Sequence, residues 1–283
     1  IQIISKGFVT IIGELSAGNN GGDGYDINNT GGYGVTLVAY TSWTDGNAGY
    51  GLQAVSSGAI SLTGLTAWNN GLGCRLDNSG GAGGGVTLVN SSCHANTPGS
   101  TSLTVLSKGF ITLVNVEARD NPQGNGVLLD NSSAAYPLGV TISTGNFWNN
   151  KGYGLHIQSK GFVSLLYVST WDNQGDGIYI DNTNGYGVYI LNNNRQYNGN
   201  NQGYGLFVQT NGPVTVNGAN FWTNLKGSYI ENTGGLAGVT LLYSGFDSSD
   251  SSPAFFPGLT INTNGAVYLL KVETGYSADG GMI

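Results

Sequence analysis

The chain has 283 residues and a net charge of −7, with 9 basic and 16 acidic residues and no cluster of basic side chains. An acidic chain without a basic patch has no positive surface to bind the phosphates of nucleic acids, so we expect no nucleic-acid partner. Glycine accounts for 49 residues and hydrophobic residues for 39% of the chain, a combination that excludes a disordered linker, and no run of 18 apolar residues is present to span a membrane.

Two short sequence patterns alternate along the chain. The first contains Ser-Lys-Gly-Phe at residues 5–8, 107–110 and 159–162, and its glycine recurs at positions 7, 58, 109, 161 and 212, about every 51 residues. Halfway between these lies a second pattern, typified by Gly-Val-Thr-Leu, with glycines at positions 34, 85, 139, 187 and 238. A fixed period without helical spacing of apolar residues predicts stacked repeats. We expect about eleven coils, two of which form one 51-residue unit.

Each coil repeats the same internal order. A short strand with alternating apolar residues, such as 111–113 or 140–142, precedes a turn that contains asparagine and a Gly-x-Gly segment. A second alternating strand follows, such as 127–129 or 155–157, and a second turn closes the coil. Alternation turns one set of side chains inward. Strands this short bury a continuous core only when the coils stack.

Aligned coils place asparagine repeatedly at one position of the first turn, where stacked amides can hydrogen-bond along the axis and to turn backbone. The second coil has Asp45 there. A second turn column alternates Asn29, Asn78, Asn131, Asn182 and Asn232 with Ser or Thr. We predict that both columns are structural. The first ladder comprises Asn19, Asn70, Asn96, Asn121, Asn150, Asn173, Asn198 and Asn224.

This order of strands, asparagine turns and Gly-x-Gly segments resembles the right-handed parallel β-helix superfamily, over the whole chain. The superfamily includes pectate-lyase-like enzymes, adhesin stalks and large bacterial surface repeat proteins, and the two-coil repeat is most similar to the last group. The resemblance implies an all-β right-handed parallel β-helix, or β-solenoid, located outside the cell or on its surface. We expect one domain over residues 1–283, as a segment of a longer chain or fibre.

An acidic column follows the second strand in alternate coils, at Asp77, Asp130, Asp181 and Glu231, with Asn28 in the first coil. Neighbouring members would lie about 9.6 Å apart, too far to share a calcium ion. We predict that they cap turns, and we expect no catalytic residue, metal or cofactor. The alternative is a polysaccharide lyase or glycoside hydrolase that uses Asp130 and Asp181, because inverting glycosidases separate their carboxylates by a similar distance.

The outward positions of the first strand form two columns, one rich in Thr and one mostly aliphatic. Such residues suit strands in any case, but a long uncharged stripe also marks an interaction surface. We predict an interaction face for a second copy or another surface. It comprises Thr10, Ile12, Thr36, Val38, Thr87, Val89, Thr112, Val114, Leu166, Leu191 and Leu242.

Aromatic residues recur near the first turn. One predicted column holds Trp43, Trp68, Trp148, Trp171 and Trp222, and Tyr50, Tyr153 and Tyr204 precede the second strand in alternate coils. Adjacent rings can stack on each other, which stabilises the fold or a self-association. They can also contact sugar rings, so carbohydrate is the alternative partner.

Two remaining motifs are weaker. The two cysteines, Cys74 and Cys93, are too few for a disulfide framework, and we expect both to be buried free thiols. Asn-x-Ser/Thr sequons occur at Asn28, Asn90 and Asn131 and are possible glycosylation sites if the protein is secreted in a glycosylating cell.

The regular coils lead to a first functional hypothesis: a non-enzymatic extracellular structural protein. It would be a β-helical filament subunit or a surface stalk that self-associates through its coil ends and its Thr/aliphatic face. The second hypothesis is a cell-surface adhesin that binds carbohydrate through the aromatic columns, and the third is the lyase or hydrolase described above.

Overall fold

The computed structural model of the chain describes residues 1–81, 83–94, 100–192, 196–249 and 256–276. All regular elements in this part of the chain are β-strands. None of the described residues therefore belongs to a helix long and apolar enough to cross a membrane.

The strands form two long sheets, in which every neighbouring pair is parallel and each strand pairs with its equivalents one coil earlier and one coil later. Sheet A is built from β1 (Gln2–Ile4), β3 (Tyr25–Asn29), β5 (Tyr50–Ser56), β8 (Leu72–Asp77), β10 (Leu103–Leu106), β12 (Val127–Asp130), β14 (Leu155–Gln158), β16 (Ile178–Asn182), β19 (Leu206–Thr210), β22 (Ser228–Asn232) and β25 (Leu259–Thr263).

The main path of sheet B consists of β2 (Phe8–Gly18), β4 (Gly34–Asp45), β6 (Ala59–Thr63), β9 (Val86–His94), β11 (Ile111–Arg119), β13 (Val140–Trp148), β15 (Val163–Trp171), β17 (Val188–Leu191), β20 (Val214–Asn217), β23 (Val239–Leu242) and β26 (Val267–Leu270). Where the second half of a coil pairs separately, it forms β7 (Thr66–Trp68), β18 (Asn198–Gly199), β21 (Asn220–Asn224), β24 (Gly245–Ser248) or β27 (Glu273–Tyr276).

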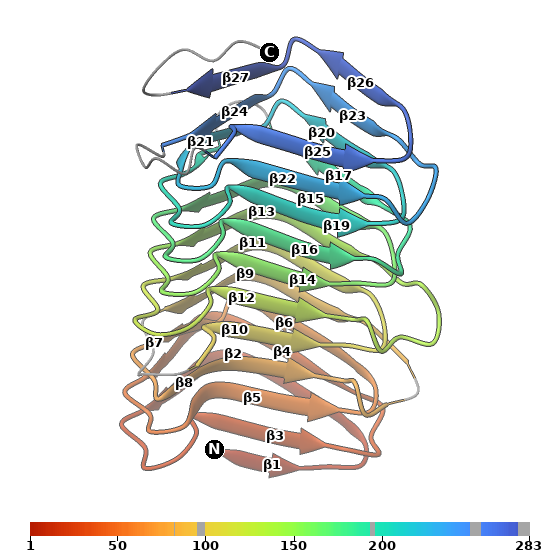
Figure 1. The fold of residues 1–283 in the computed structure, drawn as a ribbon. Helices are drawn as coiled ribbons and strands as arrows, with labels where there is room; N and C mark the ends of the chain where they lie inside the picture. The colour runs from red at the N-terminus through yellow and green to blue at the C-terminus, as the bar shows by residue number, and fades with distance from the viewer. Residues whose placement is uncertain (82, 95–99, 193–195, 250–255, 277–283) are drawn as a thin grey trace.

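The coils stack in chain order, so the N-terminus lies at one end of the molecule and β27 at the other (Figure 1). Eleven strands follow one another in sheet A within the described part of the chain, which corresponds to about ten turns at roughly 26 residues per turn. The predicted all-β parallel β-solenoid is therefore confirmed, with about ten turns where about eleven coils were expected.

Sheet B bends at one residue in each of the strands β9, β11, β13 and β15. Asn90, Asn115, Thr144 and Tyr167 occupy this position with φ between 48° and 64°, the left-handed region that short polar residues reach most easily. Two consecutive side chains face outward there before the burial alternation resumes. The bend divides the outer surface of sheet B into a first part and a second part.

The first-turn ladder is present, and each rung follows a residue in the left-handed conformation. The amide Nδ2 of Asn150 donates to Oδ1 of Asn173 at 3.0 Å, and Asn173 donates to Asn201 at 2.9 Å. Asn173 is fully buried, so the ladder pairs amides that would otherwise be unsatisfied in the core. The rungs in the described residues are Asn20, Asn47, Asn70, Asn121, Asn150, Asn173, Asn201 and Asn224.

Three predicted rungs were wrong and one falls outside the described residues. Asn19 has φ 54° and is exposed; it is the left-handed residue that precedes the rung Asn20. Asp45 faces outward opposite Trp68, and the rung of that coil is Asn47. Asn198 points inward earlier in its coil, where its Oδ1 accepts from the Thr170 backbone N–H at 3.0 Å. Asn96 lies outside the described residues.

The second-turn column matches its prediction. Asn182 is fully buried and donates to the carbonyls of Ser159 and Gly161, while Oγ1 of Thr210, its partner in the next coil, donates to Asn182 Oδ1 at 2.9 Å. The alternation of Asn with Ser or Thr thus closes the turns of successive coils.

The core is one column of buried apolar side chains from both sheets, and it contains a disulfide. Cys74 in β8 and Cys93 in β9 are bonded across the interior, with Cα atoms 6.5 Å apart, so the expectation of free thiols was wrong. The sequence places each cysteine at an inward position, but the facing of the two strands across the core depends on coil geometry.

Candidate binding site on the outer face of sheet A

The acidic column caps turns. Each of its members accepts hydrogen bonds from the Ser or Thr two residues later; Asp130 Oδ1, for example, accepts from Ser132 N at 2.8 Å and from Ser132 Oγ at 2.6 Å. Asp181 accepts from the N–H and the hydroxyl of Thr183, and Glu231 accepts from the Thr233 hydroxyl. Among the described residues, no three His, Cys, Asp or Glu side chains converge on a point where a metal ion could sit. These contacts account for the column as turn chemistry.

The two Thr and aliphatic columns lie side by side on the first part of sheet B. Thr112 pairs with Thr87 and Thr141, and Val114 pairs with Val89 and Ser143, and the same register continues in both directions. The eleven residues of the predicted interaction face all occupy these two columns. Neither column includes a charged residue, so the first part of sheet B presents an uncharged strip.

Four of the five predicted tryptophans share one column on the second part of sheet B. Trp148 and Trp171 are stacked, with ring centroids 5.2 Å apart and planes 8° from parallel, and the Arg119 guanidinium lies 4.9 Å from the Trp148 ring centre. Trp68 and Trp222 belong to the same column. Because the paired rings cover each other's faces, this column is mainly a stabilising stack.

Trp43 lies outside that column, contrary to the prediction. Val38 and Thr44 are six residues apart, whereas their partners in the next coil, Thr63 and Ala67, are four residues apart. The longer segment moves Trp43 two positions ahead of Trp68 and leaves it 59% exposed.

The structure reveals an aromatic column on the outer face of sheet A that was not predicted from the sequence. His156, Tyr179, Phe207 and Tyr229 occupy successive coils at the middle of the second strand. The Tyr179 and Phe207 centroids are 4.9 Å apart and their planes differ by 2°, and Phe207 stacks on Tyr229 at 5.4 Å. The sequence signal for this column is an aromatic residue between two inward apolar residues, as in Ile-Tyr-Ile at 178–180 and Leu-Phe-Val at 206–208.

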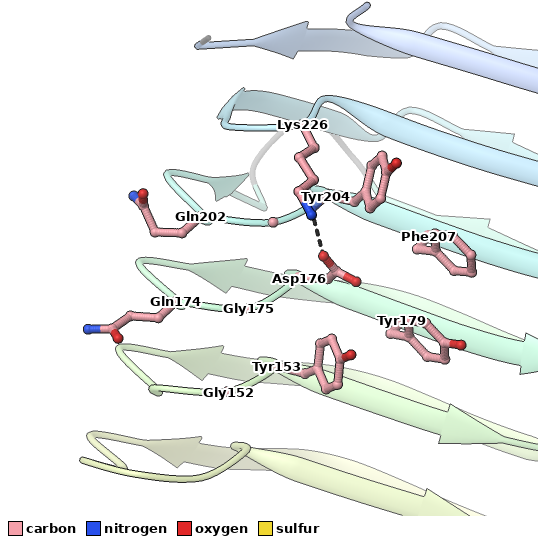
Figure 2. A pocket seen from close by; sticks show the side chains of 11 residues that line it. Gly152, Tyr153, Gln174, Gly175, Asp176, Tyr179, Gln202, Tyr204, Phe207 and Lys226 are labelled. Atoms are coloured by element: carbon pink, nitrogen blue, oxygen red, sulfur yellow. Dashed lines mark hydrogen bonds between the residues drawn. The ribbon is translucent and has the colours of Figure 1, made fainter. Parts of the chain in front are cut away.

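Beside this column, Tyr153 and Tyr204 border a cleft of about 380 Å³. Figure 2 shows Asp176 between the two tyrosines along the solenoid axis, with Tyr179 and Phe207 on one side. Tyr153 contacts Tyr179 at 5.3 Å and Tyr204 contacts Phe207 at 5.6 Å, both with tilted planes. The tilt distinguishes the two bordering rings from the parallel stack beside them. The remaining lining residues are Gly152, Gln174, Gly175, Gln202, Gly203 and Lys226.

Asp176 is held at the base of the cleft by backbone. Its Oδ1 accepts from the Tyr204 N–H at 2.7 Å. A Cβ on Gly203 would lie 2.1 Å from that oxygen, so glycine is required for the contact. The arrangement recurs 51 residues earlier, where Asn125 Oδ1 accepts from the Tyr153 N–H at 2.9 Å. The fold thus positions both tyrosines by the same device.

The electrostatics of the cleft depend on Asp176 and Lys226. Burial raises the pKa of Asp176, against the opposing effects of the Tyr204 N–H and of the Lys226 ammonium. The Lys226 ammonium lies 5.5 Å from the centre of the Tyr204 ring, within cation–π range. The cleft therefore combines aromatic surface with one buried acceptor and one cation.

The three sequons differ in accessibility. The side chains of Asn28 and Asn90 are exposed. Asn131 is fully buried and its amide donates to the carbonyl of Gly109 at 3.2 Å. A glycan cannot be attached to an amide nitrogen that is buried in a turn, so Asn131 is removed as a glycosylation site.

No protein-family model matches the chain, and searches of the curated proteins and of the solved structures find no match either. The class of the molecule is therefore defined by its own geometry, which is that of a parallel β-solenoid repeat protein with an asparagine ladder.

Proposed function

We propose that the chain is a non-enzymatic extracellular scaffold that binds carbohydrate through the outer face of sheet A. The supporting observation is the cleft between Tyr153 and Tyr204, in which aromatic side chains surround the Asp176 carboxylate. Binding sites for small ligands typically combine apolar or aromatic walls with a few fixed polar groups. The resemblance to large bacterial extracellular β-helix repeat proteins supports a place outside the cell or on its surface.

The geometry favours this cleft over the tryptophan column. Trp148 and Trp171 use their facing surfaces on each other, whereas Tyr153 and Tyr204 lie in coils separated by Asp176 and each ring is inclined to the ring beside it instead of being stacked on it. A sugar ring binds an aromatic side chain through one ring face, and the Lys226 ammonium over the Tyr204 ring can occupy only one of its two faces.

A glycan array tests the proposal. We expect the wild-type chain to bind one group of glycans, the double variant Tyr153→Ala plus Tyr204→Ala to lose that binding, and Trp148→Ala plus Trp171→Ala to keep it. Loss of binding only in the tryptophan variant would move the site to sheet B, and an array without any bound glycan would contradict carbohydrate binding.

A second proposal concerns self-association, as a filament subunit or stalk. It is supported by the uncharged strip on the first part of sheet B, which repeats at every coil and can match the same strip of a second copy at a spacing of about 4.8 Å. A molecule with a net charge of −7 repels copies of itself least where it has no charge.

Negative-stain microscopy over a range of concentrations tests this second proposal. We expect laterally associated rods or filaments for the wild type and single rods for Thr112→Lys plus Val114→Lys. Single short rods at every wild-type concentration would contradict it, without bearing on carbohydrate binding.

A further inference from the structure

The cleft also indicates which sugars it accepts. Resting on the carbohydrate-binding function proposed above, we infer that it holds one uncharged pyranose ring between Tyr153 and Tyr204 and discriminates against uronic acids. The inference rests on the spacing of the tyrosines, on the position of Asp176 and on the charges nearby.

The spacing comes from the coil register. Gly154 N donates to the Asp176 carbonyl at 3.0 Å, and Gly177 N donates to the Tyr204 carbonyl at 2.8 Å, so Tyr153, Asp176 and Tyr204 belong to three successive coils. The two tyrosines are therefore two coil spacings apart, or about 9.6 Å. A single saturated ring fits between two aromatic side chains at that spacing, whereas adjacent coils leave no room for one.

Asp176 is short enough to leave this space open and supplies a hydrogen-bond acceptor at its base. A carboxylate has two acceptor oxygens. The Tyr204 N–H donates to Oδ1 of Asp176, so Oδ2 can accept a hydrogen bond from a sugar hydroxyl. Gly152, Gly175 and Gly203 around it have no side chains to fill the cleft. The hydroxyls of a neutral sugar suit such a site.

The charges around the cleft disfavour an acidic sugar. The acidic column runs along the same face of sheet A. Asp181 lies two residues after Tyr179 in β16, and Glu231 occupies the equivalent position two coils later. The cation among the lining residues, Lys226, lies over the Tyr204 ring and already interacts with the Asp176 carboxylate, so its charge is partly offset before a ligand enters. A uronate carboxylate would meet Asp176 within the cleft, and the repulsion of two like charges at about 4 Å amounts to about 1 kcal/mol even in water, or about fivefold in affinity.

The chain contains a matched control for the tyrosine pair. Asp23 Oδ1 accepts from the Tyr50 N–H at 2.7 Å, as Asp176 does from Tyr204. Tyr50 pairs with Leu72 in the next coil, and the outward position nearby is Gln53 rather than an aromatic residue. Tyr50 thus has the same local backbone without the second aromatic border.

The test is a calorimetric titration of the full chain with three probes: methyl β-D-glucopyranoside, N,N′-diacetylchitobiose and digalacturonate. We expect at least one neutral probe to bind and digalacturonate to bind at least fivefold more weakly. Tyr153→Ala and Tyr204→Ala should each weaken the neutral probe about tenfold, and Tyr50→Ala should leave its affinity unchanged.

Asp176→Asn separates charge from shape. The amide oxygen of Asn can still accept from Tyr204 N–H, as Asn125 accepts from Tyr153, so the variant should fold. We expect its affinity for digalacturonate to rise about fivefold relative to the wild type. Digalacturonate binding as tightly as the neutral probes would overturn the inference and leave carbohydrate binding in place. If none of the probes and no glycan on the array binds, the inferred preference for neutral sugars and the proposed carbohydrate binding are both contradicted.

Discussion

The two halves of sheet A have the same interior and different outer faces. In the N-terminal half the middle outward column reads Gln2, Asp26, Gln53, Arg75, Thr104 and Leu128, and in the C-terminal half it reads His156, Tyr179, Phe207, Tyr229 and Thr260. The buried residues on either side of this column remain aliphatic or small throughout, apart from Tyr25. The coil repeat thus constrains the inside of the solenoid, and the outside can diverge from coil to coil.

This difference indicates where specific chemistry can be located in a repeat protein. A ladder rung or a turn cap occurs in every coil or every second coil because the fold requires it. The aromatic column and the Tyr153–Tyr204 cleft occupy only a few coils, so the fold itself does not explain them. The following experiments test the shared interior first and the divergent exterior afterwards.

The largest expected effect comes from removing one rung of the ladder. Asn173→Ala deprives the Asn150 N–H and Nδ2 of their acceptor and the Phe147 carbonyl of its Asn173 donor, and it leaves Asn201 Oδ1 with the backbone N–H of residue 173 alone. Several buried polar groups without partners should lower the free energy of unfolding by about 4 kcal/mol. Urea denaturation measures it.

The same substitution in the other half sharpens the comparison. Asn70→Ala breaks the equivalent contacts of Asn47 and should be as costly as Asn173→Ala, whereas the exposed Gln174→Ala should change stability by less than about 0.5 kcal/mol. A cost confined to one half would mean that the interiors are not equivalent.

The disulfide occurs in the N-terminal half and should stabilise that region. Cys74 and Cys93 are 19 residues apart, and closing a loop of this length contributes about 3 kcal/mol through the unfolded state. We expect Cys74→Ala plus Cys93→Ala to lose about that much, and the wild type to lose a similar amount on reduction. Unchanged denaturation after reduction would contradict the assignment of a disulfide.

Acid should weaken the aromatic half through His156. Burial lowers the pKa of His156, against the opposing charges of Asp181 and Asp130. The unfolded chain then binds the proton more readily than the folded chain, so stability falls as the pH drops below about 6.5. We expect the free energy of unfolding, measured by urea denaturation, to be smaller at pH 5 than at pH 7.5.

His156→Phe should remove part of that loss and extend the ring stack to Tyr179. His94, whose pKa is also lowered by burial and by Arg119, remains in this variant and accounts for the rest. If acidification lowers the stability of His156→Phe and of the wild type by the same amount, protonation of His156 does not contribute to the loss.

The smallest effect concerns Asp176. Because its pKa is raised in the fold, the protonated form is favoured there, and stability declines as the pH rises through the interval between about 3.8 and the folded pKa. At pH 7, Asp176→Asn should therefore be slightly more stable than the wild type, and the difference should vanish near pH 3. Calorimetric melting at the two pH values measures it; a less stable variant at pH 7 would show that the Lys226 attraction outweighs burial.

Much of this structure follows from the sequence, because the period and the alternation determine which residues point inward. The two Thr and aliphatic columns and the acidic column have the predicted register. One error lies where two asparagines adjoin, and another where a segment of β4 is longer than its counterpart in the next coil. Asn20, and not the adjacent Asn19, forms the rung, and the longer segment before Thr44 displaces Trp43 from the tryptophan column.

Contacts between elements were harder to predict than columns within one element. The pairing of Cys74 with Cys93 requires two strands to face each other across the core, and nothing in the local pattern specifies this. The cleft depends on three residues spaced by 23 and 28 positions, Tyr153, Asp176 and Tyr204, which only the coil register brings together. The residue before each rung offers a usable signal, since a left-handed residue, most often Asn or Asp, followed by Asn marks the ladder.

The central claim is that the aromatic half of sheet A, and not its polar half, binds carbohydrate. The most direct measurement is a map of backbone and aromatic chemical shifts during titration with whichever neutral glycan binds the wild type. We predict shifts around Tyr153, Asp176, Tyr179, Tyr204 and Phe207, with Tyr50 and Arg75 unaffected. Shifts at Tyr50 and Arg75, or only along the tryptophan column, would contradict the claim.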